Sequence, residues 1–203
     1  MNETTIYIPT RDDGHLTTYE LVIYDGVMDP AAVRAANLLG AFALAASDRL
    51  RTATESASGT SAAAPAALVT IAMYPGCTIE RLARALRITH SGSVRLVDRL
   101  GSEGLVRRRP GSDARSIALE LSAAGRRAAE HALTARRDAM TQILDLLDEG
   151  ERTRLVRLLE KALGGMTCSR LDANSICRLC DEPACERLFC PVDRAARAVN
   201  SGR

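Results

Sequence analysis

The chain lacks tryptophan, and aromatic residues make up only 3% of its 203 positions. This shortage disfavours proteins that bind single-stranded nucleic acid by stacking its bases on aromatic side chains. Charge of one sign is not in strong excess either, because 27 basic and 25 acidic residues leave a formal net charge of +2. So small a net charge does not by itself indicate a nucleic-acid partner. Lysine is almost missing, since Lys161 is the only one.

Long apolar runs are also missing. The longest, around residues 38–46, falls far short of the roughly 20 apolar residues that a membrane-spanning helix needs. The first residues, Met1–Thr4, offer neither the basic nor the apolar segment of a signal peptide. With 46% hydrophobic and 26% charged residues, the composition is typical of a globular protein with a sizeable core. We therefore expect a cytoplasmic protein with no membrane partner.

Three segments differ in pattern. Residues 1–28 predict an N-terminal β-hairpin, because two β-rich runs flank the turn at Asp13-Gly14. Residues 29–163 are mostly helical in pattern and form the predicted main domain. Its first helix begins at Asp29-Pro30 and is expected to end near Leu50, with residues 52–64 as a flexible connection. Residues 164–203 form a cysteine-rich tail that is too short to hold a core of its own.

The centre of the main domain has an ordered series of elements. A helix over residues 79–86 follows a second helix that begins near Pro65, and after a turn the next helix covers about 91–103. Strands at 105–109 and 116–121 then flank a turn. A long helix starts at Ser122, and a capping box of Asp148 and Glu151 starts the last helix, which is expected to end at Leu163. The predicted fold is mainly α with a small β wing, a winged helix-turn-helix.

This series resembles the MarR family of bacterial transcriptional regulators over about residues 30–163. The matching segments are Leu82–Leu86, Ser91–Leu100, Gly104–Arg108, Asp113–Arg115 and Leu119–Gly125. The resemblance implies a homodimer, joined by its first and last helices, that binds a pseudo-palindromic operator in double-stranded DNA. It also implies that a small aromatic or phenolic effector is possible, although no residue identifies one.

Residues 84–115 carry an excess of five positive charges, which predicts a basic face on the helix-turn-helix and wing. A helix-turn-helix places the start of its second helix in the major groove, where hydroxyl and guanidinium groups contact bases or phosphates. By the resemblance, the wing arginine enters the minor groove and an aspartate orients it; the alternative is an ion pair that only stiffens the wing. The candidate DNA-contacting residues are Ser91, Ser93, Arg95, Arg99, Arg109, Asp113 and Arg115.

Cysteine is concentrated near the end of the chain, in the pattern Cys177-x2-Cys180-x4-Cys185-x4-Cys190. Four thiolates at this spacing can hold an iron–sulfur cluster or a structural zinc ion, or can act as a thiol switch without metal. A zinc ribbon usually has two Cys-x2-Cys pairs and this segment has one, so an iron–sulfur cluster is favoured and zinc is the alternative. Cys168 is a possible further ligand.

The predicted function is operator binding tuned by this cysteine-ligated centre, acting as a redox or iron–sulfur sensor. The alternative is a regulator with a purely structural zinc site that responds to a phenolic or aromatic ligand or to thiol oxidation. An enzyme is not expected, because His15, His90 and His131 are dispersed and no catalytic arrangement emerges. Isolated Cys77 is expected to be buried or incidental and not a metal ligand.

Overall fold

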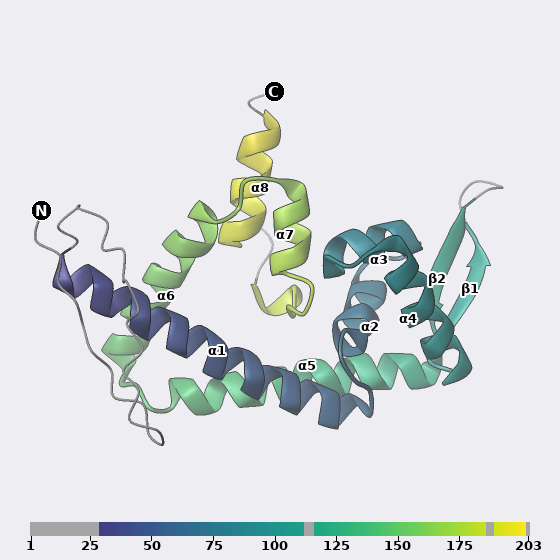
Figure 1. Ribbon diagram of the computed structural model, residues 1–203, viewed down its shortest axis with the longest axis horizontal. Coiled ribbons are helices and arrows are strands. Elements are labelled where there is room, and N and C mark those ends of the chain that lie inside the picture. The colour runs from purple at the N-terminus through teal and green to yellow at the C-terminus, as the bar shows by residue number, and fades with distance from the viewer. Residues whose placement is uncertain (1–28, 112–115, 186–188, 202–203) are drawn as a thin grey trace, which may run out of the picture. The chain divides into compact units, whose positions relative to one another are not determined.

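The computed structural model describes residues 29–111, 116–185 and 189–201 (Figure 1). The predicted N-terminal hairpin therefore lies outside the described residues. The chain divides into two compact units, residues 1–43 and 44–203. In the first unit the described part is the beginning of helix α1, and all the other helices and strands belong to the second.

Helix α1 covers Pro30–Ser58, and Asp29 caps its start by accepting a hydrogen bond from the Ala31 N–H at 3.0 Å. The flexible connection predicted from residue 52 is wrong as far as Ser58, because these residues continue the helix. Their small polar side chains bond back to helix carbonyls: the Thr54 hydroxyl donates to Leu50 O at 2.9 Å, and the Ser58 hydroxyl to Thr54 O at 2.6 Å.

The first half of α1 leaves large apolar side chains exposed, including Leu38, Leu39 and Phe42. By length and composition alone, α1 is long and apolar enough to cross a membrane, with a mean hydropathy of 1.2 over 18 residues. A helix that packs in a protein interface has the same apolar character, so composition does not distinguish the two environments.

The helix-turn-helix consists of α3 (Ile79–Leu86) and α4 (His90–Ser102), preceded by α2 (Ala64–Met73). The hydroxyl of Thr78 accepts from the Arg81 N–H at 3.2 Å and begins α3, as predicted. Thr89 caps α4 in the same way. Both hydroxyls satisfy backbone donors that a helix start leaves free, so local sequence defines the two helices.

The wing is an antiparallel pair of β1 (Val106–Pro110) and β2 (Ile117–Leu121), in which Arg108 lies opposite Leu119. The N–H of Leu119 also donates to Cys77 O at 2.7 Å, which joins the wing to the segment before α3. The predicted helix, turn, helix and two-stranded wing are therefore present in this order.

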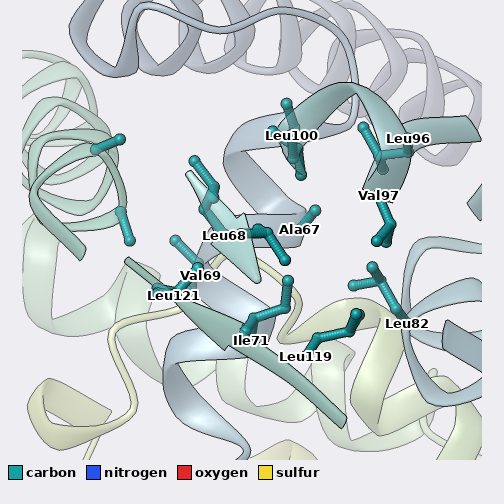
Figure 2. Close-up of a cluster of buried hydrophobic side chains, with 14 of the residues drawn as sticks. Ala67, Leu68, Val69, Ile71, Leu82, Leu96, Val97, Leu100, Leu119 and Leu121 are labelled. Atoms are coloured by element: carbon teal, nitrogen blue, oxygen red, sulfur yellow. The ribbon is translucent and has the colours of Figure 1, made fainter. Parts of the chain in front are cut away.

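The main core lies among α2, α3, α4, the wing and α5 (Ala123–Leu144), as Figure 2 shows. Leu68, Leu82 and Leu100 are fully buried there. Burial of a leucine side chain contributes roughly 1.5–3 kcal/mol, so each of these three residues contributes stability of that order. Cys77 is buried as predicted, and burial raises the pKa of its thiol to about 11.

Helix α5 approaches the wing closely because it has a glycine in its first turn. A Cβ atom on Gly125 would lie 2.1 Å from the backbone oxygen of Leu105, so only glycine fits this position. Ser122 caps the helix by accepting from the Gly125 N–H at 3.0 Å, and its hydroxyl donates to Gly104 O at 2.7 Å. These contacts join α5 firmly to the winged helix.

Helix α6 (Glu149–Gly165) begins with the predicted capping box and runs through Gly165. The residues after it form α7 (Arg170–Ile176), a short 3-10 turn (Pro183–Cys185) and α8 (Pro191–Ser201). We call these three elements, together with the described loop residues between them, the C-terminal module. The expectation that this tail holds no core is wrong, because three small residues form a buried cluster between α7 and α8: Ala173, Val192 and Ala196.

Candidate DNA interface and cysteine cavity

Helix α4 has one buried and one exposed face. Ser91, Arg95 and Asp98 are exposed, whereas Ser93 is fully buried. The hydroxyl of Ser93 donates to Ile79 O at 3.2 Å and so joins α4 to α3. The prediction that Ser93 contacts DNA is wrong, because its position on the helix faces the core together with the apolar residues of α4.

The arginines of this region differ in whether an acidic partner neutralises them. Among the described residues, five of them have one: the pairs are Arg84–Glu80, Arg87–Asp172 (2.9 Å), Arg99–Glu103 (3.9 Å), Arg108–Asp98 (2.7 Å) and Arg109–Glu120 (2.6 Å). Arg95 on α4 and Arg107 on β1 are exposed and have no acidic partner within the described part of the chain. Their charge is therefore the most available to a phosphate group.

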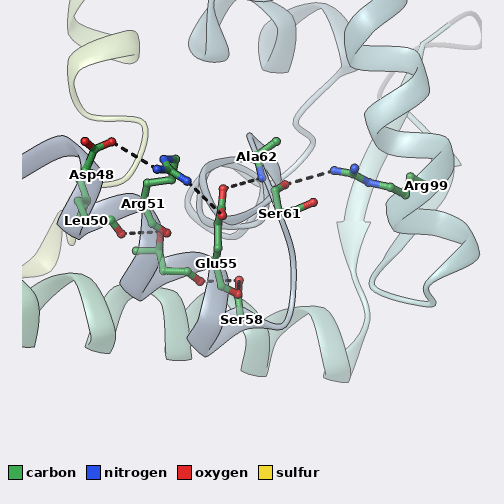
Figure 3. A network of polar contacts seen from close by, with 9 residues as sticks. Asp48, Leu50, Arg51, Glu55, Ser58, Ser61, Ala62 and Arg99 are labelled. Carbon is green, nitrogen blue, oxygen red and sulfur yellow. Dashed lines mark hydrogen bonds and ion pairs between the residues drawn. The ribbon is translucent and has the colours of Figure 1, made fainter. Parts of the chain in front are cut away.

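Arg99 is directed toward the connection between α1 and α2 (Figure 3). Its guanidinium donates to Ser61 O at 3.3 Å, and the adjacent Ala62 N–H donates to the Glu55 carboxylate at 2.8 Å. These bonds hold α4 against the end of α1. Arg99 thus has a structural contact that its position on the helix did not reveal.

The predicted wing residues are placed only in part. Arg109 donates to the Glu120 carboxylate at 2.6 Å across the two strands, so this interaction occupies its guanidinium within the wing. Asp113 and Arg115 lie outside the described residues. Their predicted contact with the minor groove stays a prediction.

The four cysteines of the predicted metal site line one cavity of about 260 Å³; they are Cys177, Cys180, Cys185 and Cys190. Exposed Cys168 is not part of its lining. Within the described ranges, no three His, Cys, Asp or Glu side chains are close enough together to hold a metal ion as they stand. The fold therefore places the four thiols around one cavity, but they are not close enough together to bind one metal ion without moving.

Two of the thiols interact directly. The Cys177 thiol donates a hydrogen bond to Cys180, which lowers the pKa of Cys180 to about 6 and raises that of Cys177. The guanidinium of Arg136 on α5 lies 3.9 Å from the Cys180 sulfur and lowers this pKa further. Both interactions favour the thiolate form of Cys180, which is the form that binds soft metals and attacks electrophiles.

Part of the cavity wall comes from the winged helix, which the sequence pattern did not indicate. Tyr74, at the end of α2, donates to the Glu182 carboxylate at 2.6 Å, and burial together with this bond raises its pKa to about 12. The guanidinium of Arg81 lies 4.1 Å from the centre of the Tyr74 ring and also lines the cavity. These residues are about a hundred positions from the cysteines, so no local signal connects them.

The arrangement of α3, α4 and the two-stranded wing defines a winged helix-turn-helix protein. Residues 58–116 match the sequence profile of the MarR family. This match covers the helix-turn-helix and part of the wing, and it lies within the segment where the sequence pattern resembles that family. A comparison with curated protein sequences finds no significant match.

Several solved structures share the fold. A MarR family protein from Bacillus stearothermophilus is 23% identical with a TM-score of 0.61, and the match covers 70% of this chain and 99% of that one. RV1404 from Mycobacterium tuberculosis is 23% identical with a TM-score of 0.56, covering 68% and 95%. Wild-type MarR from E. coli is 22% identical with a TM-score of 0.55, covering 68% and 99%. Each match covers almost the whole of the solved chain but only about two thirds of this one. This chain therefore has residues that these matches do not cover.

Proposed function

We propose that the protein is a homodimeric transcriptional regulator, and not an enzyme, that binds a pseudo-palindromic operator in double-stranded DNA. The observation that carries this proposal is the exposed face of α4, where Arg95 has no acidic partner among the described residues. On the neighbouring wing, Arg107 is likewise exposed and has no acidic partner in the described part of the chain. A MarR family domain over residues 58–116 supports it. Such a regulator works where the DNA is, in the cytoplasm.

In this proposal α4 lies in the major groove. Ser91, in its first turn, is close to base edges or phosphates, and Arg95 follows one turn later, where a guanidinium binds guanine or phosphate. Asp98 holds Arg108 at 2.7 Å and so fixes the wing relative to α4. On the sequence argument, Arg115 reaches the minor groove and Asp113 orients it.

A second copy of the chain is the proposed partner of the exposed apolar side chains. On α6, Val156, Leu158 and Leu159 are exposed, and on the first half of α1 so are Leu38 and Leu39. Isolated exposed leucines are ordinary, but several on one helix indicate an interface. Two-fold symmetry would then place the recognition helices about one DNA turn apart, roughly 34–36 Å. Light scattering that gives a monomer at micromolar concentration would contradict the dimer.

The finer proposal is that Cys177, Cys180, Cys185 and Cys190 hold one metal centre that tunes operator binding. All four line one cavity, and Arg81 and Arg136 provide positive charge that offsets thiolates. An iron–sulfur cluster is favoured, and it would supply a state that changes with oxidation. Zinc is the alternative, and it would only stabilise the fold of the segment that binds it. Regulation would then come from a phenolic or aromatic ligand or from thiol oxidation.

Two measurements test this function. An operator is selected from random duplex DNA, and its affinity is compared for wild type, Arg95→Ala and the control Arg137→Ala, which removes an exposed arginine from α5. Only Arg95→Ala should weaken binding, by about 1–3 kcal/mol. Anaerobic purification followed by iron, sulfide and zinc analysis identifies the metal. Equal affinities would refute the assigned face of α4, and a protein without metal would refute the centre.

A further inference from the structure

The C-terminal module contacts both the DNA-binding part and the last long helix of its own chain. Helix α7 packs on α3, and α8 packs on α6 and α7 (Figure 1). Leu163 of α6 joins the small buried cluster between α7 and α8. The module therefore connects the proposed dimerisation helix with the helix-turn-helix.

Several contacts hold the module against the winged helix. Asp172 on α7 accepts from Arg87 in the turn between α3 and α4 at 2.9 Å. Glu182 accepts from the Tyr74 hydroxyl at 2.6 Å. Arg136 of α5 reaches the Cys180 sulfur. These contacts come from three separate elements of the winged helix, so they define one docked position.

The loop that carries the first two thiols is also the loop that docks. Between Cys177 and Cys180, the carbonyl of Arg178 accepts from the buried Thr70 hydroxyl at 3.3 Å, and Leu179 packs against the main core. The two thiols line the cavity while the residues between them contact α2. Anything that fixes the conformation of this loop also fixes its contact with the winged helix.

We propose that residues of both the module and the winged helix form the cysteine centre, and that binding of a thiophilic metal there docks the module on α3. The docked module then acts as a brace, because it holds α3 in a fixed position relative to α6. This inference rests on the proposed function. In a dimer, the brace would fix the position of each recognition helix relative to the dimerisation helices. A regulator in which both recognition helices are already correctly spaced binds DNA more tightly than one that must first order them. The metal-loaded form is therefore the form with high operator affinity.

The decisive variant removes the apolar docking contact of the cysteine loop, Leu179, and keeps every thiol. Leu179→Ala is compared with the matched control Leu171→Ala, since Leu171 lies on α7 of the same module and is exposed. Each protein is loaded with Zn²⁺ alone or, anaerobically, with iron and sulfide, and operator affinity is measured before and after metal removal. Wild type and Leu171→Ala should lose at least tenfold in affinity when the metal is removed. Leu179→Ala should bind the same amount of metal but change less than threefold.

A second readout does not need DNA. Metal loading should slow hydrogen exchange of the α3 amides in wild type, and this protection should be lost in Leu179→Ala and reduced in Tyr74→Phe, which removes only the hydroxyl that bonds Glu182. Tyr74→Phe also covers the case in which Leu179→Ala fails to fold. Protection confined to the module itself would overturn the inference.

The outcomes separate the inference from the proposed function. A wild-type protein that binds DNA but no metal overturns this inference and the metal centre together. A protein that binds metal but no operator overturns the proposed function, while hydrogen exchange still decides whether the module docks. Metal and DNA binding with equal coupling in wild type and in Leu179→Ala leaves the proposed function standing and overturns the brace.

Discussion

The core of the winged helix is built around the fully buried Leu68, Leu82 and Leu100, whereas the cluster between α7 and α8 consists of two alanines and a valine. Large side chains bury more apolar area, and hydrophobic stabilisation grows with that area. The module relies more on polar contacts, such as Arg170–Asp193 at 2.7 Å and Arg197–Asp193 at 2.6 Å. The Arg170 contact lowers the pKa of Asp193, with a smaller contribution from Arg197.

The difference shows which region can fold unaided. Partly exposed ion pairs stabilise a fold only weakly, so the module has little to offset the entropy of ordering its chain. The winged helix has a larger buried apolar cluster to offset that entropy. We therefore expect the module to depend on a metal, on docking or on both, and the winged helix to be independent of them.

Loss of the thiols should have the largest effect and should be confined to the module. Changing Cys177, Cys180, Cys185 and Cys190 to serine should abolish metal binding and expose α7 and α8 to proteolysis, because metal binding supplies the folding energy of small metal-bound segments. The winged helix should stay intact. Metal analysis and limited proteolysis measure both effects, with Cys168→Ser as the control. A loss of metal in Cys168→Ser equal to that in the other variants would show that the ligand set is wrong.

Removal of a core leucine should destabilise the winged helix itself. Leu82→Ala should cost about 2–5 kcal/mol, because it removes a fully buried side chain and leaves a cavity. Val192→Ala in the module should cost clearly less global stability. Urea unfolding followed by circular dichroism measures the two costs, and a larger cost for Val192→Ala would reverse the comparison between the regions.

Operator affinity should respond to the wing more than to the module surface. Arg115→Ala should cost about 1–3 kcal/mol of operator affinity without changing the fold. Arg194→Ala, an arginine of α8, is the control of equal charge. Binding is measured by fluorescence anisotropy at fixed salt. Equal affinity of Arg115→Ala and wild type would exclude the predicted contact with the minor groove.

The smallest expected effect concerns Arg107. If its unpaired guanidinium contacts a phosphate, Arg107→Ala should weaken binding to all sequences alike and reduce the slope of log affinity against log salt by about one. Arg109→Ala should change this slope less, because Glu120 already neutralises that guanidinium. Titrations at several salt concentrations with operator and with base-substituted duplexes distinguish the two. A sequence-dependent loss for Arg107→Ala would assign it to base contact instead.

Much of the secondary structure follows from local sequence. Thr78, Ser122 and the Asp148–Glu151 capping box begin their helices where the sequence predicts, because a cap needs only neighbouring residues. The end of α1 could not be predicted in this way. Its small, polar residues are typical of a linker, yet Thr54 is buried against the rest of the fold and the helix continues to Ser58.

The sequence by itself determined the order of helices and strands in the winged helix, the MarR-type pattern and the set of clustered thiols, since each depends on residues close together in the chain. Only the tertiary structure decided that Arg99 bonds to Ser61 and that Tyr74, Arg81 and the cysteines line one cavity. These facts depend on which elements pack together. Packing is set by contacts between residues far apart in the chain, and no local pattern encodes them.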